Sequence, residues 1–218
     1  MTEQLGSHDH LFDILRGVAA LTGNRVVARM AATVAKHRRA DLAIAFNHKQ
    51  IGSKLWVADT LAQILPGPLG GVWILGGWHG MLAAILQDDL RLDCGIVTSV
   101  DLDPGCAPVA ETLNAPALAE GRFKATTGDM LALDYANAPG LIINTSCEHL
   151  ADVPGWRARL RPGQLALMQS NNYFREPDHV SCVADLEAFK AQAGLSKVLF
   201  AGERETRNYN RFMLIGRA

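Results

Sequence analysis

The sequence of 218 residues has few cysteines, little net charge and no long uninterrupted apolar run. Its four cysteines, Cys94, Cys106, Cys147 and Cys182, form no C-x-x-C pair, which argues against a zinc knuckle or a redox motif. We therefore expect free thiols in a reducing, cytoplasmic compartment, and the sequence identifies no set of metal ligands.

The formal net charge of -1 and the shortness of the apolar runs exclude further classes of protein. A balanced charge gives no overall attraction to nucleic acid or to an anionic membrane. The longest apolar run, residues 72–86, is shorter than the ~20 residues of a membrane helix, and glycines and a histidine interrupt it. The N-terminal segment is too polar for a signal peptide. We expect no nucleic-acid partner and no membrane partner.

Hydrophobic residues make up 49% of the chain, which is enough for a sizeable core. The spacing of the apolar residues differs before and after residues 65–71. Before that Pro- and Gly-rich stretch, apolar residues recur every three or four positions. We predict an N-terminal helical extension over residues 1–66, which serves as a lid or as an oligomer contact. Its polar segment, residues 46–56, can close over a substrate or simply be a solvated helix start. The sequence does not decide whether the protein forms a homodimer.

After that stretch, strand-like segments alternate with helix-like ones. The pattern predicts strands in residues 71–77, 94–104, 122–130, 140–146, 164–173, 197–205 and 208–217. Alternation implies right-handed crossovers and a mostly parallel sheet. The last two strands have no helix between them, so they should pair as an antiparallel hairpin at one edge. For residues 67–218 we predict an α/β fold, a three-layer sandwich around a seven-stranded sheet.

Glycines and polar residues follow the predicted strands, at the end of a parallel sheet where ligands bind. Gly76, Gly77 and Gly80 follow the first strand, Asp101 the second and Asp129 the third. Glycines allow a tight turn and the close approach of a ligand. The acid after the second strand can accept both ribose hydroxyls, and Asp129 can accept an adenine amino group. Each feature alone also fits a plain turn or a helix cap, but together they match the needs of an adenosine-containing cofactor.

These motifs, in this order, resemble those of the class I S-adenosylmethionine-dependent methyltransferases. The resemblance covers residues 70–218 and rests on VWILGGWHG, VTSVDLDP, TGDM and LIINTSCEHL. It implies a Rossmann-like catalytic domain over residues 67–218, with S-adenosyl-L-methionine as the cofactor. The cofactor-binding residues that it implies are Gly76, Gly77, Trp78, Gly80, Asp101, Leu102, Asp129, Met130 and Asn144. Leu102 would pack near adenine, and Asn144 would lie beside the methyl sulfonium.

The chain departs from the family pattern at two positions. Ile74 stands where the family often has an acid, so the amino group of the methionine part needs another partner. Trp78 replaces the central glycine of the turn, where it can shield the sulfonium or be a core aromatic residue. Asn144 is not followed by the Pro-Pro-aromatic pattern of many nucleobase methyltransferases, which together with the neutral charge favours a small-molecule substrate.

Glu148 and His149 are the candidate catalytic residues, because either can remove a proton from the acceptor during methyl transfer. The structural alternative is that Glu148 caps the following helix and His149 packs beside it. His79 and Tyr173 are candidate substrate contacts, although His79 can equally cap a helix and Tyr173 can lie on the rim.

The sequence thus predicts an S-adenosylmethionine-dependent methyltransferase acting on a small molecule. Transfer of the aminocarboxypropyl group of the same cofactor, as in nicotianamine synthase, remains an alternative because of Ile74. A non-catalytic S-adenosylmethionine-binding protein remains another. A nicotinamide dehydrogenase would need a Gly-x-Gly-x-x-Gly turn, which GGWHG does not supply. A hydrolase using Cys147 and His149 lacks a third, orienting group.

Overall fold

The computed structural model describes residues 7–38 and 40–218. The first six residues of the predicted N-terminal extension, together with Arg39, lie outside the described residues. Within the described part of the chain, no helix combines the length and the apolar character needed to cross a membrane.

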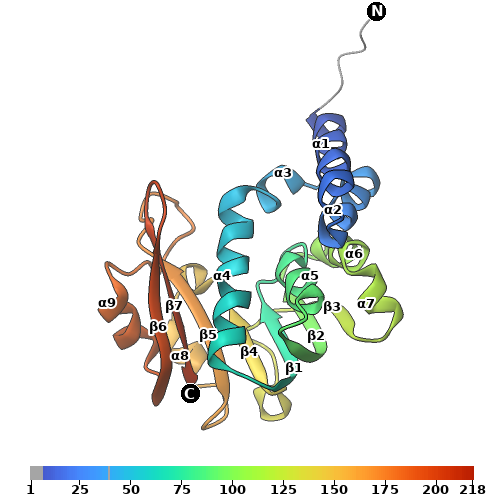
Figure 1. The fold of residues 1–218 in the computed structure, drawn as a ribbon. Coiled ribbons are helices and arrows are strands. Elements are labelled where there is room, and N and C mark those ends of the chain that lie inside the picture. The colour runs from blue at the N-terminus through green and yellow to red at the C-terminus, as the bar shows by residue number, and fades with distance from the viewer. Residues whose placement is uncertain (1–6, 39) are drawn as a thin grey trace, which may run out of the picture.

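Seven strands form one sheet in the order β3-β2-β1-β4-β5-β7-β6 (Figure 1). The strands are β1 (Pro68–Leu75), β2 (Asp93–Asp101), β3 (Phe123–Thr127), β4 (Leu141–Asn144), β5 (Leu165–Asn171), β6 (Lys197–Glu205) and β7 (Asn210–Arg217). Strands β1 to β5 pair in parallel, whereas β7 runs antiparallel to both β5 and β6. The predicted fold class is confirmed, including the hairpin of β6 and β7 at one edge.

The helices lie where the apolar periodicity and the strand-to-strand spacing place them. They are α1 (Ser7–Thr22), α2 (Arg25–Lys36), α3 (Leu42–Ala45), α4 (His48–Ile64), α5 (Met81–Asp88), α6 (Cys106–Leu113), α7 (Ala115–Ala119), α8 (Val153–Arg157) and α9 (Leu186–Ala193), with short 3-10 turns η1 (Tyr135–Asn137) and η2 (Cys147–His149). Local chemistry sets their ends. Asn47 caps α4 by accepting from two backbone N–H groups, and Gly194 ends α9 in the left-handed conformation.

The sheet is buried on both faces, which gives the three layers. On β4, Leu141 and Ile143 belong to the core under α4, α5 and α6, while Ile142 belongs to the core under α8 and α9. Side chains of one strand alternate between the two faces, so a strand covered on both sides must be apolar throughout. This explains why β4 reads as a continuous apolar run.

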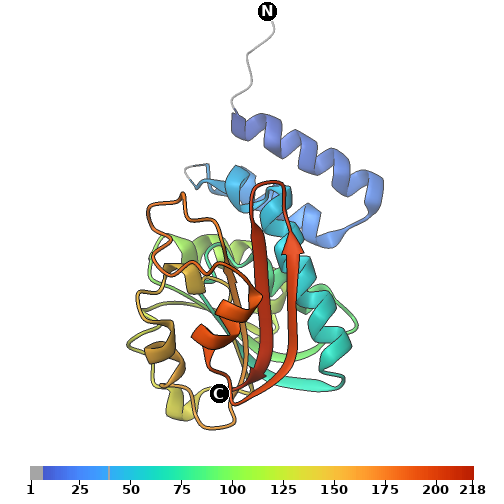
Figure 2. The ribbon, with the colours of Figure 1, turned by 90° about the vertical axis from the view of Figure 1, so that its left-hand side faces the viewer.

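The N-terminal helices occupy two different environments. Helix α4 is part of the main core, with Val57 and Leu61 fully buried, so residues on both sides of the proposed boundary at 66 and 67 contribute to one core. Helix α1 instead lies across one end of the molecule (Figure 2). It buries Leu15 but leaves Ile14 62% exposed, so only part of its predicted apolar face is covered.

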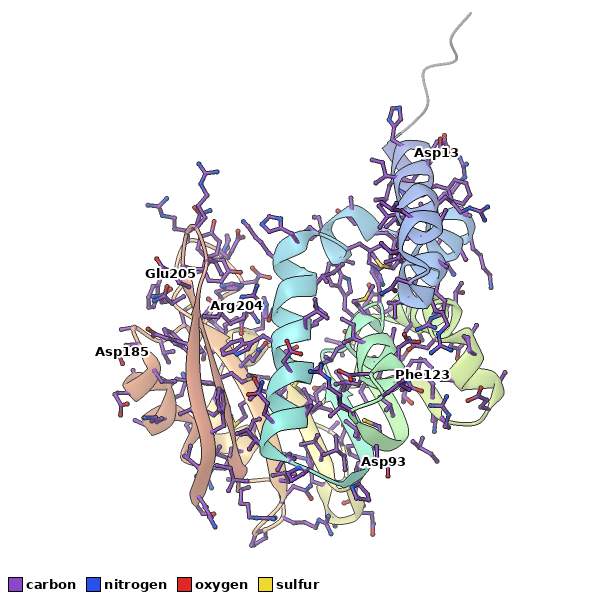
Figure 3. The ribbon with its side chains drawn as sticks, in the orientation of Figure 1. Asp13, Asp93, Phe123, Asp185, Arg204 and Glu205 are labelled. Atoms are coloured by element: carbon purple, nitrogen blue, oxygen red, sulfur yellow. The ribbon has the colours of Figure 1, made fainter. Side chains whose placement is uncertain are left out.

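Arg204 connects the edge hairpin to α4. Its guanidinium donates a hydrogen bond to the carbonyl oxygen of Gly52, in the space between β6 and α4 that Figure 3 shows. A methyl group at Gly52 would meet this guanidinium at 2.7 Å, so the end of the Arg204 side chain would have to shift to make room for it. This contact links β6 of the edge hairpin to α4. The side of α4 that faces the sheet covers the candidate site.

Candidate cofactor and substrate site

A cavity of about 1020 Å³ opens at the carboxyl ends of the parallel strands. The loops after β1, β2, β3 and β4 form one part of its wall, and the polar side of α4 forms another. Residues of β5, of β7 and of the segment before α9 complete it. Parallel strands end at the same edge of the sheet, so residues far apart in the sequence meet here.

The turn after β1 has a strained backbone that the second strand holds in place. Gly76 has a φ of +61°, and Trp78 has a φ of +47°, which is the one positive φ of a non-glycine residue within the described chain. Such a conformation costs roughly 1–2 kcal/mol for an L-residue. The carboxylate of Asp101 accepts the backbone N–H of Trp78 at 2.7 Å and thereby stabilises the turn. Gly76, Gly77, Trp78 and Asp101 all line the cavity.

The loops after β2 and β3 supply the rest of the predicted cofactor wall. Leu102 is 72% exposed, and Asp129 is exposed as well. The Oδ1 atom of Asp129 accepts the backbone N–H of Leu131 at 2.8 Å, which leaves the lone pairs of Oδ2 for a ligand. Leu102, Asp129 and Met130 line the same cavity as the glycine turn, so the structure brings these predicted residues together.

Two of the predicted cofactor residues lie behind the cavity wall. Gly80 precedes α5 with a φ of +74°, and a methyl group there would come within 2.8 Å of the Cβ atom of Ala110 in α6. Asn144 is fully buried, and its amide donates to the sulfur of Met130 at 3.6 Å. Neither residue lines the cavity. Gly80 shapes the wall through its close contact with α6, and Asn144 shapes it through its contact with Met130.

Glu148 is a buried carboxylate at the far side of the cavity, 2% exposed. Its Oε1 atom accepts from the amide of Asn171 at 2.6 Å and from the guanidinium of Arg211 at 3.1 Å. Its Oε2 atom has no hydrogen-bond partner among the described residues. Removing one partner of a buried ion pair typically costs roughly 3–5 kcal/mol. The ion pair with Arg211 therefore holds the carboxylate of Glu148 in place.

His149 and His179 lie beside this carboxylate. Their rings meet edge to face with centroids 4.7 Å apart, and both residues line the cavity. The Nδ1 atom of His149 lies 3.2 Å from the carbonyl oxygen of Asp178 and 3.5 Å from its carboxylate. The Nδ1 atom of His179 lies 3.0 Å from the carbonyl oxygen of Tyr173. Each ring is thus held at one nitrogen.

The sequence matches no protein-family model and no curated protein. Solved structures match through their fold. The N-methyltransferase NodS from Bradyrhizobium japonicum WM9, in complex with S-adenosylhomocysteine, is 13% identical with a TM-score of 0.62, over 87% of this chain and 97% of that one. The magnesium protoporphyrin IX methyltransferase ChlM from Synechocystis PCC 6803, with bound S-adenosylhomocysteine, is 15% identical with a TM-score of 0.58, over 89% of this chain and 87% of that one.

The fold is that of the class I S-adenosylmethionine-dependent methyltransferases. The sheet order and the antiparallel β7 decide this, because an ordinary dinucleotide-binding domain has no such hairpin. The same fold also serves other chemistry. The [4+2]-cyclase SpnF is 14% identical with a TM-score of 0.56, over 74% of this chain and 79% of that one.

On this methyltransferase fold, α4 adds cavity residues that the sequence did not single out. The Nζ atom of Lys54 donates to Gln50 at 2.8 Å, and the hydroxyl of Ser53 donates to the side-chain oxygen of Gln169 at 3.0 Å. Burial, and then the charge of Arg211, lower the pKa of Lys54 to about 7. The polar segment at residues 46–56 was recognisable in the sequence, but which of its residues face the cavity depends on how α4 packs.

Arg211 and His179 are harder to identify from the sequence. Arg211 is the second residue of β7, directly before its apolar residues 212–215, and His179 lies in a segment without a periodic pattern. Both side chains reach the cavity only because β7 inserts next to β5 and the segment before α9 folds back over η2. No motif in the sequence marks either residue.

The two predicted substrate residues lie away from this cavity. His79, 7% exposed, lines a second cavity of about 740 Å³ beside α2, and burial lowers its pKa. Its ring stacks on Trp78 with centroids 4.9 Å apart, and Trp78 lines both cavities. Tyr173 packs against Tyr209 and His179 at the rim. Tyr173 therefore contacts the site only indirectly, by packing against His179. His79 does so by stacking on Trp78.

Cys147 is fully buried, and burial raises the pKa of its thiol well above the ordinary value. A thiol in that environment stays protonated and is a poor nucleophile. Its Sγ atom lies 3.8 Å from the carbonyl oxygen of Asn144 and does not line the cavity. The geometry gives no support to a hydrolase built on Cys147 and His149.

Proposed function

We propose that the protein is an S-adenosylmethionine-dependent methyltransferase that acts on a small-molecule acceptor. One observation carries this proposal. The glycine turn, Asp101 and Asp129 share a single cavity of about 1020 Å³ with Lys54, whose lowered pKa lets it exchange a proton, and with the side chain of His149. A cavity shared in this way can hold a donor and an acceptor side by side, as direct transfer requires.

The residues of the glycine turn and the acids fit the cofactor. A methyl group at Gly76 would come within 3.0 Å of the hydroxyl of Ser146, so glycine keeps this part of the cavity open. Asp101 uses one lone pair on each oxygen for the backbone N–H groups of Trp78 and Asp103, which leaves further lone pairs for two hydroxyls. When bound, S-adenosylmethionine supplies a methyl group on a positively charged sulfur.

The residues of this chain would then bind, align and take up a proton. Asp101 and Asp129 would hold the ribose and the adenine, and Trp78 would offer an aromatic face near the positive sulfur. Lys54, with its pKa lowered to about 7, is partly deprotonated at neutral pH and can accept the proton that the acceptor loses. Helix α4, which carries Lys54, would exclude water from the acceptor.

Calorimetry tests the cofactor directly. Titration with S-adenosylmethionine, S-adenosylhomocysteine and NAD should show saturable binding of the two sulfur compounds and none of NAD. If neither sulfur compound binds, the proposed function is wrong. Binding of S-adenosylhomocysteine alone would leave the cofactor class intact, and product analysis would then decide the reaction.

Transfer of the aminocarboxypropyl group is the second candidate. Ile74 is an apolar part of the cavity wall, so the methionine amino group would not meet a carboxylate at that position. Incubation with S-adenosylmethionine and a fractionated metabolite extract separates the two reactions. Methyl transfer releases S-adenosylhomocysteine, whereas aminocarboxypropyl transfer releases methylthioadenosine.

A further inference from the structure

One wall of the cavity brings together three side chains of the kinds that bind metal ions. Glu148, His149 and His179 each offer one ligand atom, and these atoms all lie within 4.8 Å of one another. Glu148 and His149 come from η2, and His179 comes from the segment that precedes α9, 30 residues after His149. All three line the cavity of about 1020 Å³.

The Oε2 atom of Glu148 supplies an independent observation. Glu148 is 2% exposed, and Oε2 has no hydrogen-bond partner among the described residues, although Oε1 accepts from both Asn171 and Arg211. A buried carboxylate oxygen without a partner is costly, because it has lost its water without gaining a donor. A cation bound at Oε2 would remove that cost.

The two imidazoles are held in the way that metal-binding histidines are usually held. A ring nitrogen that donates to a carbonyl or carboxylate oxygen leaves the other nitrogen unprotonated and free to bind a metal. The Nδ1 atom of His149 faces both the carbonyl and the carboxylate of Asp178, and the Nδ1 atom of His179 faces the carbonyl of Tyr173. The Nε2 atoms then carry the free lone pairs.

The spacing of the three ligand atoms is close to that around a single ion, and the cavity carries charges of both signs. Ligand nitrogens and oxygens lie about 2.0–2.2 Å from a zinc ion, so two ligands of one ion are separated by at most ~4.4 Å. The ligand atoms found here lie up to 4.8 Å apart, slightly beyond that limit, so the side chains would have to move closer together around an ion. The carboxylates of Glu176 and Asp178 line the same cavity, as do the cationic side chains of Lys54 and Arg211, of which Arg211 pairs with Glu148 at 3.1 Å.

The geometry points to a binding site for one divalent transition-metal ion, formed by Glu148, His149 and His179. Two imidazoles and one carboxylate suit zinc, manganese, cobalt or ferrous iron better than magnesium or calcium, which prefer oxygen ligands. Three protein ligands leave open coordination positions, as in catalytic rather than structural sites. Those positions face a cavity large enough for an acceptor molecule.

Resting on the methyltransferase function proposed above, the ion identifies the acceptor as an oxygen nucleophile such as a hydroxyl or an enol. A divalent ion acts as a Lewis acid toward such an oxygen. The acceptor O–H bond breaks and its proton passes to Lys54 or to water. An oxygen lone pair forms the C–O bond to the methyl group, the S–C bond breaks, and its electron pair stays on sulfur as a neutral thioether. Glu148 and His149 then serve as ligands and do not act as the base.

Cobalt(II) titration of the full-length protein, after removal of metals with a chelator, tests the site. We expect one Co²⁺ per chain, seen as visible absorption bands, with competition by Zn²⁺ in calorimetry. His179→Ala and Glu148→Gln should each weaken binding at least tenfold. Exposed His149→Ala gives the same test if the more buried variants fail to fold, and circular dichroism checks folding. His10→Ala, on α1, is the matched control and should bind Co²⁺ as the wild type does.

Two results would overturn the site. One is the absence of saturable Co²⁺ and Zn²⁺ binding, and the other is binding that persists in His149→Ala and His179→Ala but is lost in His10→Ala. Calorimetry with S-adenosylhomocysteine on the metal-free protein keeps the two proposals apart. Cofactor binding without metal binding refutes only the metal site, and metal binding without cofactor binding refutes only the methyltransferase function and the acceptor class drawn from it.

Discussion

The carboxylate of Asp101, at the end of β2, accepts a hydrogen bond from the backbone N–H of Trp78, in the turn after β1, at 2.7 Å. This bond holds Trp78 at a φ of +47°, in a region that bulky residues rarely adopt. The same carboxylate also accepts the backbone N–H of Asp103 at 3.1 Å. Asp101 therefore has two roles. It holds the turn after β1 in its conformation, and it presents its remaining lone pairs to the cavity.

Asp101→Ala should weaken the binding of S-adenosylhomocysteine by roughly 100-fold to 10,000-fold. The variant loses two hydrogen bonds from ribose hydroxyls to a charged acceptor, each worth about 1.5–3 kcal/mol, and releases the strained turn. Calorimetry measures the effect.

Asp103→Ala is the matched control for Asp101→Ala. Asp103 is an exposed acid two positions away, whose carboxylate accepts the N–H of Gly105 and does not line the large cavity. This variant should bind S-adenosylhomocysteine within a few-fold of the wild type. Equal binding by Asp101→Ala and the wild type would show that the ribose site is misplaced.

Gly80→Ala should lower the free energy of unfolding by about 2–4 kcal/mol, from a left-handed φ combined with overpacking against α6. The φ of Gly80 is +74°, and the new Cβ would lie 2.7 Å from the amide nitrogen of Asn114. Urea denaturation monitored by circular dichroism measures it.

Gly121→Ala separates the two causes of that loss. Gly121 has a similar φ of +69°, but a Cβ there would meet nothing within 4 Å. We expect a loss of only about 1–2 kcal/mol for Gly121→Ala, from the backbone conformation alone. Losses of the same size in the two variants would contradict a steric role for Gly80.

Lys54 should make the unfolding free energy depend on pH. Its pKa is lowered to about 7 in the folded protein, whereas an unfolded chain has the ordinary lysine value of 10.5. Between these two values the unfolded state binds more protons, so the stability of the wild type should rise with pH from about 7 to 10.5. The burial cost acts in full below pH ~7, where both states are protonated.

Lys54→Met should remove this dependence. At pH 6.5 the variant should be more stable than the wild type by on the order of 1–2 kcal/mol, because it no longer buries a charged ammonium group. Water screens part of the burial cost, which keeps this difference small. The difference should shrink toward pH 10. Exposed Lys49→Met, at the start of the same helix, is the control and should change little. A constant difference between Lys54→Met and the wild type across this range would refute a lowered pKa for Lys54.

Cys147→Ala should keep cofactor binding and product formation close to those of the wild type. The thiol is fully buried, and burial raises its pKa, so no chemistry is expected of it. Removing the sulfur should cost roughly 1 kcal/mol of stability through lost packing. Mass spectrometry of reaction products checks the activity. Loss of all activity in a folded Cys147→Ala variant would reopen a role for the thiol in the reaction.

Much of the fold was predictable because it follows from local pattern. The alternation of apolar strands with helices, the Pro- and Gly-rich stretch at residues 65–71 and the missing helix between β6 and β7 predict the sheet and its edge hairpin. The acids after β2 and β3 were predictable for the same reason, since parallel strands bring their carboxyl ends to one edge. Asp101 and Asp129 accordingly line one cavity.

The fold class, the glycine turn and the two acids follow from the amino-acid sequence alone, because each depends on residues close in the chain and on the rules of parallel sheets. The far wall of the cavity is set by long-range packing. Lys54, Arg211 and His179 come from a helix, a strand and an irregular segment whose meeting depends on long-range packing. The pairing of Glu148 with Arg211, 63 positions apart, and the grouping of Glu148 with two histidines have no local signal, because side-chain direction is set by how these elements dock.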